Sequence, residues 1–373
     1  MYQVIIIGGG LAGLTSSIHL AKKGLQVLLI EKNEYPKHKV CGEYISNEVL
    51  PYLEYLDFDP YKYGAVKIDR ITFSTTKSKT LSATLPLGGF GISRYCLDQA
   101  LANASKLNGV KILHASVSNV HFECNKFTIT TNDSNSYEGE VVIGAFGKRS
   151  NLDRNLNRSF MKESSPYLAV KAHYHGEFPD DLVSLHNFDG GYCGLSKVET
   201  DRINVCYITD YKSFKRYKNI ADFEKQVVSK NKHLEKVFSN WTPIFEKPLT
   251  ISQISFSSKN LVEDHVIMCG DSAGLIHPLA GNGMSMAIRS AYLAATLIDK
   301  YFRGEIKSRH QLEEAYIKKW KSEFHSRLAA GHIIAKLFKI SFLTEILASL
   351  IKLFPIILPS IIKMTHGKPM KIL

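Results

Sequence analysis

Residues 4–13 have the sequence VIIIGGGLAG, a short β-branched run that passes directly into a glycine-rich turn. Such a run is typical of a buried parallel strand. An amphipathic stretch at residues 14–23 follows and ends before Gly24, and a second apolar run occupies residues 26–30. The pattern predicts a strand, a helix and a second parallel strand, with the glycines at the first strand-to-helix turn.

The spacing of these glycines suits a dinucleotide. Gly8 permits a tight turn, Gly10 lets the backbone approach a pyrophosphate, and Gly13 lets the helix pack close to the strand. The pyrophosphate would then lie at the positive N-terminus of the helix, beside Leu11 and Ala12.

An acidic residue ends the second predicted strand. Glu31 lies 18 residues after Gly13, where a carboxylate can accept a ribose hydroxyl, and Lys32 follows it. Because a carboxylate disfavours a 2′-phosphate, the motif predicts FAD or NAD rather than NADP.

A second glycine-rich segment lies far along the chain. Residues 265–269 predict a strand, and they are followed by Gly-Asp-Ser-Ala-Gly at 270–274, Pro278, Gly-Asn-Gly at 281–283 and a helix over about 284–300. This pattern resembles the second FAD-binding motif of the flavoprotein superfamily that holds aromatic hydroxylases, geranylgeranyl reductases and flavin-dependent halogenases.

The resemblance implies that the nucleotide is FAD. Asp271 would then hold the ribityl chain, while Gly281, Asn282, Gly283 and Met284 would face the pyrimidine edge of the flavin. Free N–H groups at a helix start stabilise the negative charge that a reduced flavin carries there.

Two intermediate segments fit the same superfamily. Arg94, with Asp98 one helical turn later, occupies the place of an arginine that contacts the FAD phosphate or ribityl region. Residues 144–154, which include Gly147, resemble the GADGxxSxxR stretch of the superfamily. Phe146 replaces the aspartate of that stretch, which in the hydroxylases serves both FAD and NADPH, so the resemblance to NADPH-driven hydroxylases is weaker.

A third segment, residues 39–43, resembles one in geranylgeranyl-reductase-like members, where the backbone passes the flavin ring. Cys41 is then either a small buried apolar residue or a group beside the ring. Cys41, Glu43 and Tyr192 are the candidate catalytic residues. Tyr192 lies in residues 187–196, which replace the large aromatic motif of the reductases and halogenases with smaller residues and suggest room for a bulky substrate.

The predicted fold is α/β: a Rossmann-type FAD domain of the p-hydroxybenzoate-hydroxylase kind, an inserted antiparallel sheet and a helical tail. The FAD domain is expected to be discontinuous, and the sheet is expected to roof the flavin and form the substrate cavity. The expected segments are 1–63, 87–158 and 260–305 for the FAD domain, 64–86 and 159–259 for the substrate domain, and 306–373 for the tail.

The predicted function is FAD-dependent oxidoreduction of a lipophilic substrate, with NAD(P)H as a transient electron donor. Glycine at 274 and the 41–43 segment favour reduction of carbon–carbon double bonds, as in geranylgeranyl reductases. Hydroxylation of an aromatic or polyketide-type substrate is the alternative, and FAD held structurally or used without net redox is a third.

Composition and charge indicate which metals, membranes or nucleic acids the protein is expected to bind. The 373 residues carry a net charge of +12, and the six cysteines are scattered, which predicts free thiols, no metal site and a cytoplasmic protein. Residues 301–373 hold 13 basic and 5 acidic residues among many apolar ones. That tail predicts short amphipathic helices that cap the cavity or contact a membrane peripherally. Nucleic acid is not an expected partner, because the basic residues alternate with large apolar ones.

Overall fold

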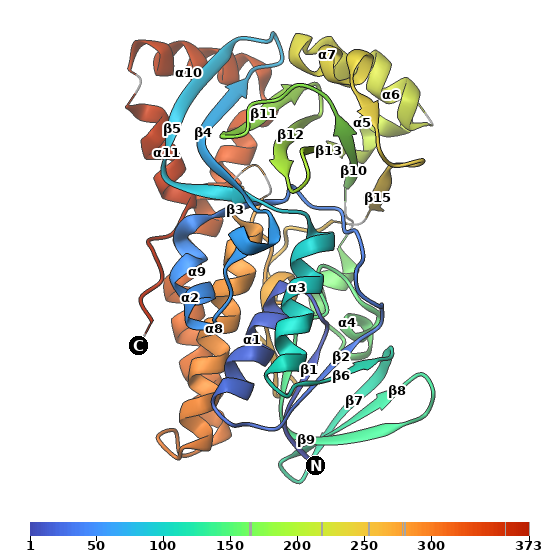
Figure 1. Ribbon diagram of the computed structural model, residues 1–373, viewed down its shortest axis with the longest axis vertical. Coiled ribbons are helices and arrows are strands. Elements are labelled where there is room, and N and C mark those ends of the chain that lie inside the picture. Colours follow the sequence, from blue (N-terminus) through green and yellow to red (C-terminus); the bar gives the residue numbers. More distant parts are fainter. Residues whose placement is uncertain are drawn as a thin grey trace.

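The computed structural model describes residues 1–163, 166–217, 219–252, 254–277, 279, 281–354 and 356–372, so that Pro278 of the second motif lies outside the described residues. Two sheets lie one above the other, with helices packed around both (Figure 1). The chain crosses between them several times, so the lower half is built from segments that are separated in the sequence.

The first sheet has a parallel centre in the order β17-β9-β1-β2-β6, with β16 antiparallel at one edge and the β7–β8 hairpin joined to β9. Its strands are β1 (Tyr2–Ile7), β2 (Val27–Glu31), β6 (Lys111–His114), β7 (Val117–Glu123), β8 (Lys126–Thr131), β9 (Ser136–Gly144), β16 (Val262–Glu263) and β17 (Val266–Met268). Residues 4–7 of β1 are fully or almost fully buried, because strands pair with β1 on both sides and helices cover it.

The second sheet has the order β14-β10-β13-β12-β11-β4-β5-β3, and β15 also pairs with β10. Its strands are β3 (Tyr44–Ser46), β4 (Val66–Ser74), β5 (Thr80–Gly91), β10 (Tyr167–His175), β11 (Leu182–Phe188), β12 (Gly191–Val198), β13 (Arg202–Asp210), β14 (Thr242–Pro243) and β15 (Leu249–Ser252). The sheet is antiparallel except that β11 runs parallel to β4.

The α-helices, in chain order, are α1 (Leu11–Lys22), α2 (Leu50–Tyr55), α3 (Arg94–Leu107), α4 (Asn151–Asn155), α5 (Tyr211–Lys215), α6 (Ile220–Gln226), α7 (Lys232–Asn240), α8 (Gly283–Phe302), α9 (Arg309–Lys339), α10 (Ser341–Leu353) and α11 (Ile357–Thr365). Helix α1 packs against α3 and α8, while α6 and α7 cover one face of the second sheet. Helices α9, α10 and α11 pack toward its other face (Figure 1).

The fold class is confirmed, with three local differences. Helix α1 begins at Leu11 rather than residue 14, and its first ten residues are all buried, so it is not amphipathic. The expected boundary between residues 86 and 87 divides a continuous strand, because β5 runs to Gly91 and pairs with β3. The second sheet contains one parallel pair, because β11 follows a long excursion of the chain rather than a hairpin from β4.

Candidate functional site

A cavity of about 1340 Å³ lies between the two sheets. Its lower part begins at the carboxyl ends of β1, β2 and β9, where Ile7, Ile30 and Ala145 contribute to its wall. Open parallel sheets bind ligands at this edge. The wall includes every predicted site residue except Gly13: Gly8, Gly10, Leu11, Ala12, Glu31, Lys32, Cys41, Glu43, Arg94, Gly147, Tyr192, Asp271, Gly281, Asn282, Gly283 and Met284.

The first turn needs its glycines for different reasons. Gly8 has φ +106°, and a Cβ there would overlap the carbonyl of Ala145. A Cβ on Gly13 would overlap the carbonyl of Gly8, which explains why Gly13 stands behind the cavity wall and not in it. A Cβ on Gly10 would meet nothing nearer than the Arg94 guanidinium at 3.8 Å, so this glycine keeps space open on the cavity side.

Helix α1 aims its N-terminus into that open space. Gly10 is the N-cap residue and brings no side-chain cap, and the first turn contains no acidic residue. The first N–H groups of a helix have no partner within it and carry partial positive charge. Leu11 and Ala12, which belong to this turn, line the cavity, so the site suits an anionic group such as a pyrophosphate.

Glu31 braces the same turn. One carboxylate oxygen accepts the N–H of Gly9 at 2.7 Å, and the other accepts the backbone N–H of Asn33 at 3.0 Å and its side-chain amide at 2.8 Å. The carboxylate therefore holds the loop and also borders the cavity where a ribose hydroxyl would lie. Lys32 is exposed at the rim.

Arg94 is fixed by a buried carboxylate. Its guanidinium donates to both oxygens of Asp98, at 2.7 and 2.8 Å, and Lys39 reaches the same carboxylate at 2.8 Å. Burial alone would raise the pKa of Asp98, but Arg94 and Lys39 lower it overall. Burial would lower the pKa of Arg94, but Asp98 raises it overall. A permanently charged guanidinium thus stands beside the open side of Gly10.

The second motif meets the end of β9. The hydroxyl of Ser272 accepts the N–H of Gly147 at 2.9 Å, and Lys259 donates to the carbonyl oxygens of Lys148 and Asp271, both at 2.8 Å. Burial lowers the pKa of Lys259 to about 8. These bonds hold Asp271 at the cavity wall, where its carboxylate has no hydrogen bond or ion pair within the described part of the chain.

The N-terminus of α8 closes the opposite side of the lower cavity. Gly281 has φ +64°, and the N-cap residue Asn282 supplies no side-chain cap to the helix. Asn282 is fully buried, its amide nitrogen donates to the carbonyl of Thr365 at 3.0 Å, and its amide oxygen is without a partner among the described residues. Uncapped amides and an unsatisfied polar atom at a cavity wall fit a polar ligand edge.

The loop of residues 39–43 passes the cavity between these parts. Cys41 is half-buried on its wall. Glu43 has φ +53° and turns its carboxylate away into the protein, where it binds Lys171 and, at 2.7 Å, Nε2 of His173. All three side chains are fully buried. Burial would raise the pKa of Glu43, but Lys171 and His173 lower it overall. Glu43 therefore anchors the loop from behind.

The sequence reasoning missed Lys171. It allowed His173 to face the cavity from its strand, whereas His173 lies off the cavity wall and binds Glu43. Lys171 and His173 both lie on β10, two residues apart, so their side chains are on the same face of the strand. This alternation of side chains along a strand was the sequence signal that could have paired them. Two further strand histidines, His175 and His186, also lie off the cavity wall; His186 binds the hydroxyl of Ser74 at 2.8 Å.

The upper part of the cavity is an apolar arm that runs between the second sheet and α9 to α11. Tyr192 and Gly194, alternate residues of β12, stand on the cavity wall, and Tyr192 packs in one cluster with Val40 of the 39–43 loop. Burial raises the pKa of Tyr192 well above its usual range, so the phenol stays protonated. Farther along, the wall is formed by Ile71, Phe73, Leu81, Leu85, Val183, Leu185, Phe338, Leu347, Ala348, Ile351, Leu358, Ile361 and Ile362.

The lower cavity fits FAD on several independent counts. Gly10 and Gly147 leave open space on its wall, and two helix N-termini without side-chain caps point at it. The Asp271 carboxylate on the same wall has no hydrogen bond or ion pair among the residues that the structure describes. Glu31 would hold a ribose hydroxyl of the cofactor, and Arg94 would supply a fixed positive charge for its pyrophosphate.

Comparison with known proteins agrees with this fit. Residues 3–42 match the model of a family described as FAD dependent oxidoreductase. Conditioned medium factor receptor 1 of Dictyostelium discoideum is 25% identical over 370 residues, covering 87% of this chain and 68% of that protein. A digeranylgeranylglycerophospholipid reductase of Methanosarcina acetivorans is 25% identical over 338 residues, covering 86% and 81%.

Among solved structures, a flavin-dependent brominase superposes with a TM-score of 0.80 at 18% identity, covering 98% of this chain and 93% of that one, which shows a shared fold. These comparisons indicate an FAD-dependent oxidoreductase that is similar to a digeranylgeranylglycerophospholipid reductase over most of its length and shares its fold with a flavin-dependent brominase.

Proposed function

We propose that this enzyme reduces carbon–carbon double bonds in a long-chain, isoprenoid-type lipid, with NAD(P)H as the source of electrons. The observation that carries the proposal is the apolar arm, which continues from the flavin site between the second sheet and α10–α11. The similarity to a digeranylgeranylglycerophospholipid reductase supports the same substrate class.

The cavity has room for two ligands. Pockets for single small molecules usually enclose about 300–1,000 Å³, whereas this one encloses about 1340 Å³. The side chains that line the arm from Ile71 to Leu85 and from Leu347 to Ile362 are all apolar. Each CH₂ group buried there contributes about 0.8 kcal/mol, before the costs of association. A hydrocarbon chain is the ligand that such a wall favours.

The residues around the lower cavity prepare hydride transfer. FAD, when bound and reduced, supplies the hydride for the double bond. Arg94 and the N-terminus of α8 stabilise negative charge at the two ends of the site. Cys41 and Tyr192 both line the cavity, and the buried Tyr192 phenol keeps its proton. Asp271 orients the cofactor.

An anaerobic experiment tests the proposal. The FAD-loaded protein is reduced without oxygen, and then geranylgeraniol or a geranylgeranylated glycerophospholipid is added while the flavin absorbance is followed. We expect reoxidation with a product in which one double bond per reduced flavin has gained a hydride and a proton, and no reoxidation with the fully saturated alcohol as control. Reoxidation only after oxygen enters, with oxygen in the product, would establish the monooxygenase alternative instead. Reduction of the flavin by NADH and NADPH in separate anaerobic mixtures tests the electron donor.

A further inference from the structure

The outer face of helices α10 and α11 is apolar and open. Eleven large apolar side chains exposed on the described residues lie between Ile333 and Met364, against six in the rest of the described chain. Eight of the eleven form what we call the lid face: Phe342, Leu343, Ile346, Leu350, Leu353, Phe354, Ile356 and Met364. Phe342, Leu353 and Ile356 are 72%, 72% and 77% exposed, so they pack on almost nothing in this chain.

The inner faces of the same two helices are already used. Ala348 and Ile351 of α10 pack against Phe73 and Leu81 of the second sheet, and Ile362 of α11 packs in a cluster with residues of β3 to β5 and β11. An amphipathic surface helix needs only one apolar face. The second apolar face of α10 and α11 therefore exceeds what folding requires, and large exposed apolar patches mark interaction sites.

Exposed lysines stand on the helices that bear the lid face, Lys352 on α10 and Lys363 on α11, and on the chain segments next to them. Residues 324–373 contain seven Lys or Arg and a single acidic residue, Glu345. Lys336, Lys352, Lys363, Lys368 and Lys371 are all exposed. Long cationic side chains that flank an apolar surface can reach lipid phosphates while their stems remain in apolar surroundings. Apolar centre and cationic rim together complement a bilayer with anionic headgroups.

The geometry favours a position in one leaflet. Helix α10 has 13 residues and α11 has 9, about 20 and 14 Å at 1.5 Å per residue, and a bilayer core is about 30 Å thick. No helix in the described part of the chain is alone long and apolar enough to span a membrane. Residues 342–353 and 357–365 reach that length and apolarity only as a pair, which is bent by 119°.

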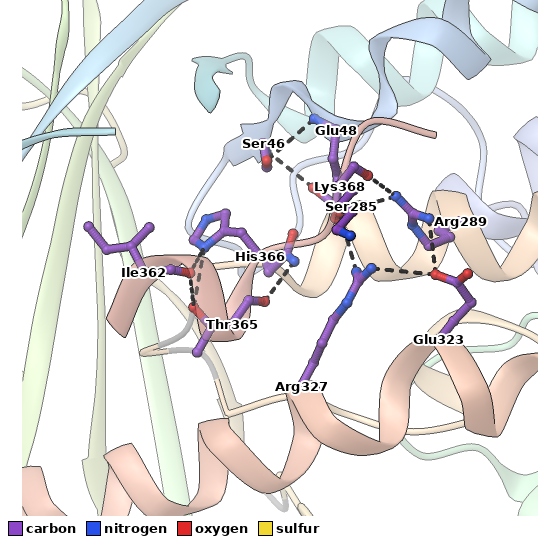
Figure 2. Close-up of polar contacts among 11 residues, drawn as sticks. Ser46, Glu48, Ser285, Arg289, Glu323, Arg327, Ile362, Thr365, His366 and Lys368 are labelled. Atoms are coloured by element: carbon purple, nitrogen blue, oxygen red, sulfur yellow. Dashed lines mark hydrogen bonds and ion pairs between the residues drawn. The ribbon is translucent and has the colours of Figure 1, made fainter. Parts of the chain in front are cut away.

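The end of the chain holds the lid in place. After α11, the tail returns to the lower half and crosses a buried charge cluster in which Arg289 and Arg327 each approach Glu48 at 3.3 Å (Figure 2). Arg289 also donates to the carbonyl of Lys368, and Asn282 donates to that of Thr365. We call these contacts of the tail the C-terminal clamp. Because α9 precedes α10 and the clamp follows α11, the two helices that bear the lid face are held at both ends.

We propose that the lid face docks this enzyme onto an anionic membrane leaflet, with α10 and α11 lying in the headgroup region. The helices that bear the lid face also form the outer wall of the apolar arm. A lipid chain would therefore have only one layer of helices to pass between the bilayer and the arm. The docking itself rests on the exposed residues and their charges and does not depend on the reaction proposed above.

Vesicle flotation tests the docking. The FAD-loaded full-length protein is mixed with vesicles of phosphatidylcholine alone or of phosphatidylcholine with phosphatidylglycerol. We expect flotation with the anionic vesicles, weakened by salt. The triple variant Phe342→Gln, Leu353→Gln, Ile356→Gln should lower the partition coefficient at least tenfold. Lys352→Gln with Lys363→Gln should lower it about fivefold for each charge removed.

Matched substitutions on the opposite end of the molecule serve as controls. Leu107→Gln replaces an apolar side chain that is 88% exposed at the end of α3, and Lys111→Gln removes an exposed charge. Both should float like the parent, and the flavin content and melting temperature of every variant should match it. Flotation that is absent, or unchanged in the triple variant, would overturn the proposal. So would a stable dimer, seen by light scattering, that the triple variant dissociates. Turnover with detergent-dispersed lipid, measured separately, reports on the reaction and not on docking.

Discussion

At the scale of single residues, Asp271 and Glu43 both lie at the cavity, but their carboxylates have different roles. Asp271 lies on the cavity wall without a hydrogen bond or ion pair in the described chain, whereas Glu43 turns inward to Lys171 and His173. A carboxylate that has no protein partner is available to a ligand, and one that is fully paired supports the backbone that carries it. The two residues should therefore fail differently when they are changed.

Asp271→Ala should remove FAD and leave the apoprotein intact. The substitution breaks no hydrogen bond or ion pair within the described chain, so the free energy of unfolding of the apoprotein should change by no more than about 0.5 kcal/mol. Flavin retained on purification and the dissociation constant for added FAD measure the effect. Asp189→Ala, at an exposed turn after β11, is the control and should purify as yellow as the parent. A fully yellow Asp271→Ala protein would remove Asp271 from the FAD site.

Glu43→Gln should destabilise the protein and change its response to acid. Loss of the carboxylate leaves Lys171 charged and buried, which costs about 3–5 kcal/mol at neutral pH. The pKa of Glu43 is lowered below 4.5 in the folded protein. The parent therefore holds this stabilisation above pH 4.5 and loses it as the pH falls through the lowered value. The variant should lose less stability over that range.

Urea unfolding of the parent and Glu43→Gln at neutral and acid pH measures both effects. The double variant Glu43→Gln, Lys171→Met removes the uncompensated charge, so it should recover much of the loss at neutral pH. An equal dependence on pH in the parent and in Glu43→Gln would show that Glu43 does not carry the acid sensitivity.

At the scale of elements, sequence patterns predicted the strands, turns and helices whose formation depends on residues close together in the chain. The run from Val4 to Gly13 predicted a strand, turn and helix because each glycine there answers a backbone constraint within a few residues. The second motif likewise predicted α8, which begins at Gly283. The tail helices were predicted from their apolar spacing, although that spacing does not distinguish the face toward the cavity from the lid face.

Contacts between distant elements could not be predicted in this way. Glu43 and Lys171 are 128 residues apart, and Glu48 lies 241 residues from Arg289. Ion pairs at such separations leave no periodic mark in the sequence, because their partners meet only after the two halves have packed. The same holds for the end of β5, which depends on its pairing with β3 and not on its own residues.

Gly367→Ala should release the C-terminal tail from the lower half. A Cβ at this position would overlap the carboxylate of Glu48 and approach the guanidinium of Arg327, so the buried cluster would have to open. Overpacking of this kind costs about 1–3 kcal/mol. The melting temperature should fall, and limited proteolysis should cut first between α11 and the C-terminus.

Lys368→Ala is the matched control for this tail prediction. The Lys368 side chain is exposed and only its backbone carbonyl meets Arg289, so this variant should resist proteolysis as the parent does. Equal protection of the tail in Gly367→Ala and the parent would show that the clamp does not hold the lid.

At the scale of the whole molecule, the cavity exists because the chain packs two sheets together. Each sheet contributes one part of the cavity wall. The lower sheet offers strand ends and helix N-termini, which suit a charged nucleotide. The upper sheet and α9 to α11 offer an apolar wall. Their junction brings the polar wall and the apolar wall into one cavity. The length of the arm, set by the packing of α10 on β4 and β5, should then set the length of substrate that the enzyme accepts.

Ala348→Trp tests that relation. Ala348 is almost completely buried, lines the arm and packs beside Phe73 and Leu81, so an indole there fills the end of the arm that α10 closes. Because each excluded CH₂ forfeits about 0.8 kcal/mol, kcat/KM for a geranylgeranyl-length substrate should fall at least tenfold. A geranyl-length substrate that does not reach Ala348 should be turned over as by the parent, which makes it the internal control for folding and flavin content. A similar loss for both lengths would mean that the chain does not enter the arm toward α10.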